Sequence, residues 1–156
     1  MHTRLIVVAG RQPSWVDEAF DNYAQRLPRQ WKFRLDAVAS VPRSKGADRA
    51  SAVAAEGQRV LDRLGAGEQL VVLDERGSEI SSIELAEKLS SWQASGRDLA
   101  FVIGGPDGIS HTVTARADFR WSLSKLTLPH GLARILFVEQ LYRAWTVSTA
   151  HPYHRA

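Results

Sequence analysis

The chain has 156 residues and a formal net charge of +3, with 44% hydrophobic and 24% charged residues. This length and mixture are typical of one ordinary globular domain, so we expect residues 1–156 to form a single domain. The chain contains no cysteine, which excludes disulfides, thiolate metal sites, iron–sulfur clusters and thiol nucleophiles. The sequence has neither a signal-peptide pattern nor the roughly 18 apolar residues of a membrane span, so we expect a soluble, cytoplasmic protein.

Charge is unevenly distributed along the chain. Residues 1–65 carry a balance of +4, residues 66–118 a balance of −5, and residues 119–156 a balance of +4. Arginine greatly outnumbers lysine, and its guanidinium group suits bidentate contacts to phosphate. The two basic flanks are therefore either solvated surfaces or the parts of the chain that contact an anionic partner.

Strands of the buried type alternate with amphipathic helices in the first half of the chain. Residues 4–10 form an apolar run closed by glycine, and Pro13 and Ser14 then begin a helix with Ser14 as its cap. Residues 32–41 alternate as expected for a strand with one exposed face. A basic loop follows and leads to an alanine-rich helix over residues 47–64.

The second half of the chain repeats this alternation. Residues 69–74 and 99–103 read as buried strands, with a helix over residues 82–95 between them. A short helix, a short strand over residues 119–122 and a final helix over residues 132–148 complete the pattern. We predict an α/β fold with a mostly parallel sheet and helices on both of its faces.

Three segments are expected at the carboxyl edge of this sheet, where open α/β sheets bind their ligands. They are residues 73–75, the glycine-rich residues 104–108 and the leucine-rich residues 123–130. The glycine-rich segment is either a tight turn or a place where backbone approaches a ligand, and it matches neither a Walker loop nor a dinucleotide fingerprint. The leucine-rich segment is either a core strand or the wall of a site for a flat, partly apolar ligand such as adenosine.

Apolar side chains cover most of the circumference of the final helix. One polar arc interrupts them, formed by Glu139, Gln140, Arg143 and Thr146. A helix this apolar needs a second packing partner besides the sheet, and another subunit is the natural one. Arg134 lies opposite the polar arc, where a buried guanidinium requires an interface carboxylate or a ligand phosphate.

The C-terminal residues 149–155 concentrate chemistry in a short tail. His151, Tyr153, His154 and Arg155 are either part of a frayed terminus or groups that stack on and hydrogen-bond to a nucleotide. The histidines lack neighbouring carboxylates or thiolates, so we expect no metal site.

Four motifs together resemble one family. They are IGGPDG (103–108), WSLSKLTLPH (121–130), EQLYRAW (139–145) and HPYHR (151–155). In this order they closely resemble the small bacterial methyltransferases of the SPOUT superfamily that modify N3 of a pseudouridine in a 23S rRNA stem-loop. The resemblance extends over the whole chain.

The resemblance implies a C-terminal deep trefoil knot, a homodimer, and S-adenosylmethionine bound by the knot loops. It places cofactor-binding positions in the segments already expected at the sheet edge: Leu73, Gly104, Gly105, Leu123, Ser124, Lys125, Leu126, Thr127 and Leu128. The reaction would be an rRNA methylation by in-line displacement, which needs alignment of the reacting atoms and no metal.

We hypothesise that the tail and the last helix position the base. The candidate catalytic residues are His130, Tyr153, His154 and Arg155. The candidate RNA-binding residues are Arg11, Arg43, Lys45, Arg49, Arg134 and Arg143. Two alternatives stay open: a non-catalytic RNA-binding or ribosome-assembly dimer that keeps the fold, and another nucleotide-binding enzyme of the doubly wound class.

Overall fold

The computed structural model describes residues 1–43 and 48–154. Within these residues, parallel strands form one sheet in the order β2-β1-β4-β3-β5. The strands are β1 (Thr3–Val8), β2 (Arg34–Val38), β3 (Gln69–Glu79), β4 (Leu99–Ile103) and β5 (Phe119–Ser122). The helices are α1 (Ser14–Ala24), the 3-10 turn η1 (Arg29–Trp31), α2 (Arg49–Arg63), α3 (Ser82–Ser95), α4 (His111–Arg116) and α5 (His130–Ser148).

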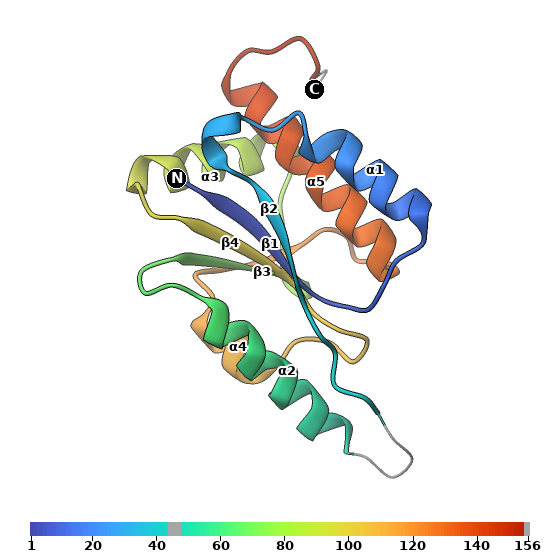
Figure 1. Ribbon diagram of the computed structural model, residues 1–156. Helices are drawn as coiled ribbons and strands as arrows, with labels where there is room; N and C mark the ends of the chain where they lie inside the picture. The colour runs from blue at the N-terminus through green and yellow to red at the C-terminus, as the bar shows by residue number, and fades with distance from the viewer. Residues whose placement is uncertain (44–47, 155–156) are drawn as a thin grey trace.

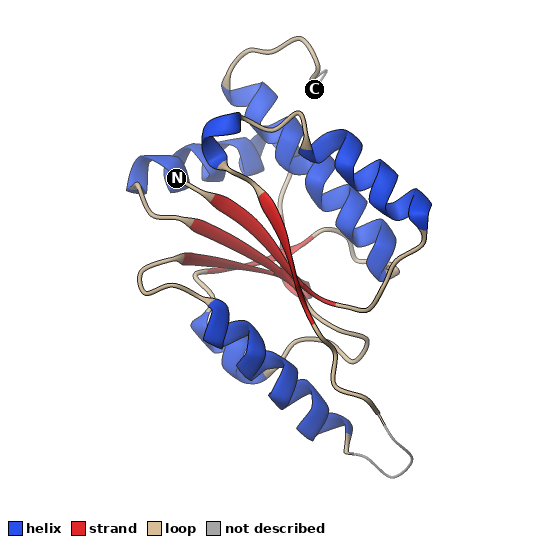
Figure 2. Cartoon of the chain, in the orientation of Figure 1, coloured by secondary structure: helices blue, strands red, loops and turns tan. Residues whose placement is uncertain are grey.

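Helices cover both faces of the sheet, as the sequence predicted (Figure 1). In Figure 2, α1, α3 and α5 pack on one face, and α2 and α4 pack on the other. Successive residues of β1 point to opposite faces, so Leu5 and Val7 join the core beneath α5 while Ile6 and Val8 join the core beneath α2. Because helices cover both faces of the sheet, the central strands are continuous apolar runs in the sequence.

The edge strand β2 differs from its prediction. It is shorter than residues 32–41, because Lys32 takes a left-handed conformation with φ of 46° at the end of η1. Its exposed face carries Leu35, whereas Val38 on the other face is buried. The prediction of one exposed face is confirmed.

Smaller differences concern the ends of elements. Ser14 is not a helix cap, since α1 is preceded by Pro13 at the cap position with no side-chain hydrogen bond. Strand β3 continues past the predicted end at residue 74 to Glu79, and α5 begins at His130 rather than at residue 132. Thr146, predicted on the polar arc of α5, is fully buried, and its hydroxyl donates to the Arg143 carbonyl oxygen instead of facing solvent.

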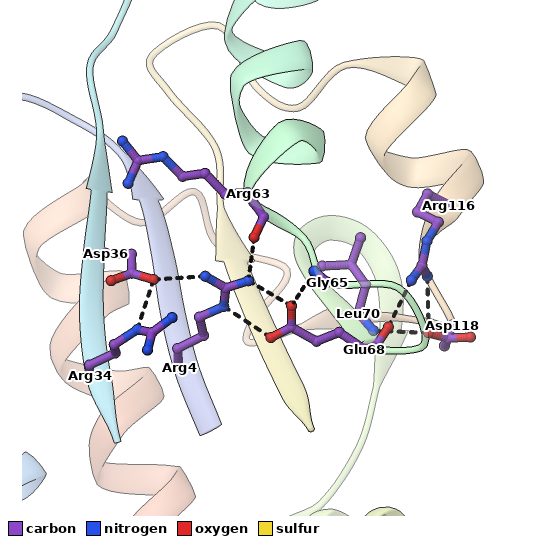
Figure 3. A network of polar contacts seen from close by, with 9 residues as sticks. All are labelled: Arg4, Arg34, Asp36, Arg63, Gly65, Glu68, Leu70, Arg116 and Asp118. Atoms are coloured by element: carbon purple, nitrogen blue, oxygen red, sulfur yellow. Dashed lines mark hydrogen bonds and ion pairs between the residues drawn. The ribbon is translucent and has the colours of Figure 1, made fainter. Parts of the chain in front are cut away.

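A network of charged residues fills the amino edge of the sheet (Figure 3). Arg4 on β1 is 8% exposed, and its guanidinium donates to Glu68 at 2.9 and 2.6 Å and to Asp36 at 2.9 Å. A further bond of 2.6 Å joins Arg4 Nη2 to the Arg63 carbonyl oxygen at the end of α2. Every nitrogen of the Arg4 guanidinium therefore has a partner, so this charge links β1, β2, α2 and the loop before β3.

Candidate functional site

A cleft of about 730 Å³ opens at the carboxyl edge of the sheet. It is lined by the end of β3 from Leu73 to Arg76, by the glycine loop (residues 104–108) and by the apolar segment (residues 123–128). The structure thus brings together the three segments that the sequence placed at this edge. Of the predicted cofactor residues, Lys125 alone does not line the cleft. The volume lies in the range of about 300–1,000 Å³ that small-molecule sites occupy.

The glycine loop presents backbone to the cleft. The Gly108 N–H donates to the Gly105 carbonyl oxygen at 3.0 Å, and Gly108 has a φ of +93°, which favours glycine. A Cβ at Gly104 would lie 2.4 Å from Ile109 Cγ1 and 2.9 Å from the Gly108 carbonyl oxygen. The loop is therefore a tight turn, and the same lack of side chains leaves its backbone open to a ligand.

The apolar segment is held in place by short-range hydrogen bonds. The Ser122 hydroxyl donates to the Ser124 carbonyl oxygen at 2.9 Å, and the Leu126 N–H donates to Ser124 Oγ at 2.9 Å. Across the cleft mouth, Thr127 Oγ1 donates to Glu75 Oε2 at 3.3 Å. These bonds allow the leucine side chains to remain at the cleft rather than collapse into the core, and Leu126 is 73% exposed.

An ion pair lines the same cleft at the end of β3. Arg120 Nη2 donates to Asp74 Oδ2 at 2.6 Å, and the Arg76 N–H donates to Asp74 Oδ1 at 3.0 Å. Burial raises the pKa of Asp74, but the hydrogen bonds from Arg120 and Arg76 outweigh it and hold that pKa below its usual value. Sequence reasoning did not single out Arg120, because its partner lies 46 residues away on a neighbouring strand and no local pattern links them.

The N-terminal end of α5 lies beside the glycine loop and carries His130 and Arg134. His130 Nε2 is 2.8 Å from Arg134 Nη2. Burial and the Arg134 charge lower the pKa of His130 to about 4, although a hydrogen bond with the Gly104 backbone opposes the shift. Arg134 is 4% exposed, and within the described chain its Nε has no hydrogen-bond partner. A direct contact of Arg134 with RNA on the surface of one chain is thus not available, because the side chain is buried.

The tail packs at the opposite end of α5 (Figure 1). Tyr153 donates its hydroxyl proton to Glu139 Oε1 at 2.9 Å, and its ring lies 4.6 Å from that of Tyr142. Burial and the hydrogen bond to Glu139 raise the pKa of Tyr153, so the phenol is protonated at neutral pH. Since Glu139 lies nine residues from His130, about 14 Å of helix separates this contact from the cleft end of the same chain.

The candidate catalytic residues are therefore divided between two places. His130 lies at the cleft end of α5, while the Tyr153 hydroxyl is held by Glu139 in the middle of the helix and His154 follows Tyr153 in the tail. His154 Nδ1 is buried and lacks a hydrogen-bond partner among the described residues. Arg155 lies outside the residues that the structure describes.

The candidate RNA-binding arginines also differ in their surroundings. Arg11 and Arg49 are exposed, whereas Lys45 lies outside the described residues. Arg43 is held by ion pairs with two carboxylates, and Arg143 Nη2 donates to Glu139 Oε1 at 2.7 Å. Arg11 and Arg49 thus have the surroundings expected of phosphate contacts, and Arg43 does not.

Residues 1–43 and 48–154 contain neither a candidate metal site nor a helix that could cross a membrane. Those residues contain no cluster of three or more histidine, aspartate or glutamate side chains suited to holding a metal ion. None of the helices in that part of the chain has the length and hydropathy that a bilayer crossing requires.

Comparison with known proteins gives the family. The model of a family described as predicted SPOUT methyltransferase matches residues 1–154. The chain belongs to the SPOUT methyltransferase family. The ribosomal RNA large subunit methyltransferases H of Methylococcus capsulatus and Hahella chejuensis are 46% and 43% identical to it over 155 residues. These alignments cover 99% of this chain and 100% and 99% of those relatives.

A solved structure shares the fold of this SPOUT methyltransferase at much lower sequence identity. It is a probable methylase family protein from Haemophilus influenzae Rd KW20, with a TM-score of 0.57 and 12% identity. The match covers 99% of this chain and 70% of that one, and it supports the α/β architecture alone. The family match, by contrast, extends over the cleft, α5 and the described part of the tail.

Proposed function

We propose that this protein is an S-adenosylmethionine-dependent methyltransferase that modifies N3 of a pseudouridine in a 23S rRNA stem-loop. The proposal rests on the family match, on the names of the full-length relatives and above all on the cleft at the carboxyl edge of the sheet. The working form would be a cytoplasmic homodimer in which each chain carries the deep trefoil knot of the family.

The residues around the cleft fit such a cofactor. The glycine loop offers backbone groups at close range, and Leu123, Leu126 and Leu128 offer an apolar wall for an adenosine. The predicted cofactor positions Leu73, Gly104, Gly105, Ser124 and Thr127 lie in the same lining. When bound, S-adenosylmethionine supplies an activated methyl group to a nucleophile held in line with its sulfonium.

Exposed apolar side chains support a dimer built on α5. Leu132 and Leu136 are one helical turn apart on α5 and are 43% and 42% exposed. Trp15 on α1 and Ile83 on α3 are also exposed, and both helices pack against α5. A second copy of the chain would bury this surface, as isologous interfaces of apolar helices do.

The position of the tail along α5 supports a site shared between two chains. The Tyr153 hydroxyl of a chain is held by Glu139, nine residues or about 14 Å along α5 from His130, so it does not reach the His130 end of its own chain. In a dimer, the tail of the partner would provide these groups. The cleft of one chain and the tail of the other then form one active site.

In this site each residue has a limited chemical role. N3 of the base must lose its proton as the new N–C bond forms. Tyr153 keeps its own proton at neutral pH, so it would orient the base as a donor rather than act as the base. His130 is neutral at that pH but a weak proton acceptor, which leaves His154 and positioning by Arg155 as the remaining candidates from the tail.

RNA would bind along the exposed basic residues. Among the described residues, Arg11 and Arg49 are the candidates for backbone contacts; Lys45, the third candidate from the sequence, lies outside them. Replacing Arg11 and Arg49 with glutamine should weaken RNA binding and flatten its dependence on salt, since fewer counterions are released. An unchanged slope would mean that the RNA binds elsewhere.

Two measurements test the proposal. Calorimetric titration with S-adenosylmethionine should show binding, and large subunits or whole ribosomes lacking the modification should gain one methyl group on N3 of a pseudouridine. Absence of cofactor binding would contradict the proposal. RNA binding without cofactor binding would instead identify a non-catalytic RNA-binding dimer.

Mixing two inactive variants tests the shared site. Gly104→Ala disables the cleft by the clash of its Cβ with Ile109, and a Tyr153→Phe/His154→Ala double variant disables the tail. After subunit exchange, half of the dimers are mixed and each has one intact site, so about a quarter of wild-type activity should return. If every site used its own tail, mixing would restore nothing.

A further inference from the structure

Helix α2 contains a buried carboxylate that the cleft residues do not explain. Glu56 is 2% exposed on a helix otherwise rich in alanine. Its Oε2 accepts the Val41 N–H at 2.8 Å, and its Oε1 accepts a bond of 3.0 Å from Arg43 Nη2. Because burying a carboxylate is costly unless it is paired, this arrangement points to a role that requires the charge.

Arg43 connects this carboxylate to the glycine loop. Its Nε donates to Asp107 Oδ2 at 2.9 Å, while both of its terminal nitrogens donate to Glu56. The hydrogen bonds to these two carboxylates raise the pKa of Arg43, and the hydrogen bond from Arg43 lowers that of Glu56. One guanidinium thus joins α2 to the loop that lines the cleft.

Two glycines allow close packing around this link. A Cβ on Gly57, the next residue of α2, would lie 2.0 Å from the Ser110 hydroxyl, just after the glycine loop. A Cβ on Gly105 would lie 3.1 Å from Glu56 Oε1. Two glycines therefore allow α2 and the loop to come together at the point where Glu56 and Arg43 act.

We propose that Glu56 and Arg43 are positioning residues that hold the glycine loop in the shape that binds the cofactor, with Arg43 acting on the loop through Asp107. Arg43 is then no RNA contact, because its donors are already engaged by carboxylates and by the Val41 carbonyl oxygen. The inference rests on the proposed function for the identity of the ligand, but not for the link itself.

The test of this link changes Asp107, which is its exposed end. Asp107→Ala removes the bond to the loop and leaves the pair of Glu56 and Arg43 intact, so the protein should fold. We expect amide hydrogen exchange over residues 104–110 of the free protein to accelerate severalfold, and affinity for S-adenosylmethionine to fall about five- to tenfold. Asp107→Asn, which keeps an oxygen acceptor, should recover part of both effects. The control is Asp62→Asn, also on α2, whose carboxylate accepts only the Gln58 side chain at 2.8 Å.

A double-mutant cycle separates this role from direct contact of Asp107 with the cofactor. Arg43→Gln alone strands the Glu56 carboxylate and risks unfolding, so Arg43 is removed together with that charge as Glu56→Gln/Arg43→Gln. In this background, Asp107→Ala should have little further effect on exchange or affinity, and the salt dependence of RNA binding should equal that of the wild type. A full additional effect, unchanged exchange in Asp107→Ala, or a flatter salt dependence would overturn the proposal. If the wild type bound no cofactor, the proposed function would be wrong. The hydrogen-exchange data would still show whether Asp107 links Arg43 to the glycine loop.

Discussion

Two buried arginines among the described residues, Arg4 and Arg134, illustrate how the two edges of the sheet differ. Both are less than 10% exposed, at 8% and 4%. Arg4 lies at the amino edge, where two carboxylates and a carbonyl oxygen satisfy its guanidinium. Arg134 lies near the carboxyl edge, where its contacts include a neutral imidazole, and its Nε has no partner within the described residues.

The difference indicates that Arg4 serves the stability of the fold and that Arg134 serves its function. A buried charge with all its partners inside the chain contributes to folding, and removing it strands the partners. A buried charge with partners missing costs stability in the isolated chain, and Asp17 on α1 raises the pKa of Arg134 too little to offset burial. Arg134 is therefore suited to an acceptor that arrives from outside the chain, on the partner subunit, rather than to a direct contact with RNA.

The largest effect is expected from Arg4→Met. Because Glu68 and Asp36 would lose their shared partner, the free energy of unfolding in urea should fall by about 3–5 kcal/mol. The remaining folded protein should methylate RNA normally, since Arg4 lies at the edge opposite the cleft. The control is Arg34→Met: Arg34 contacts the same Asp36 at 3.1 Å, but it is exposed, so its loss should cost at most about 1 kcal/mol. Equal losses for the two variants would contradict the contrast between the edges.

The opposite outcome is expected for Arg134→Met. Replacing an incompletely paired guanidinium with an apolar side chain should change the free energy of unfolding by no more than about 1 kcal/mol, or raise it. Methyl transfer should fall at least about tenfold in kcat/KM, because one charge-assisted hydrogen bond to the incoming acceptor is lost. A destabilisation as large as that of Arg4→Met, with normal activity per folded molecule, would show that the residue is structural.

Whether a feature of the fold or of the site could be predicted from the sequence depends on how far apart in the chain its residues lie. The order of strands and helices along the chain and the meeting of three segments at the cleft follow from local patterns and from one rule about parallel sheets. The Glu56–Arg43–Asp107 link joins residues 13 and 64 positions apart and leaves no periodic signal. The separation of the tail from its own cleft depends on where α5 ends and on how the tail folds back. Sequence patterns therefore located the cleft but not the place along α5 at which Tyr153 packs.

The smallest predicted effect is a dependence of stability on pH that arises from His130, the neighbour of Arg134. The pKa of His130 is about 4 in the folded protein, below the roughly 6.5 of an unfolded histidine. Above pH 6.5 the imidazole is neutral in both states and contributes no pH dependence. Between pH 6.5 and 4 the unfolded state binds a proton that the folded state does not, so stability falls as the pH falls.

Because His130 is only partly buried, solvent screens its charge, and the expected loss of stability is about 1 kcal/mol, or about 2–4 °C in Tm. The measurement is Tm between pH 8 and 4.5 for the wild type and for His130→Gln, which keeps a polar side chain but has no proton to gain. The lowered pKa values of Asp36, Glu56 and Asp74 also reduce stability as the pH falls toward 4.5, but none of these residues is changed in the variants, so the comparison isolates His130. His130→Gln should flatten the acid side of the curve, whereas Arg134→Met should leave less repulsion on the protonated imidazole, raise its pKa in the folded protein toward 6.5 and so make the fall in Tm smaller. Curves that coincide for all three proteins would mean that the charge of Arg134 does not act on His130.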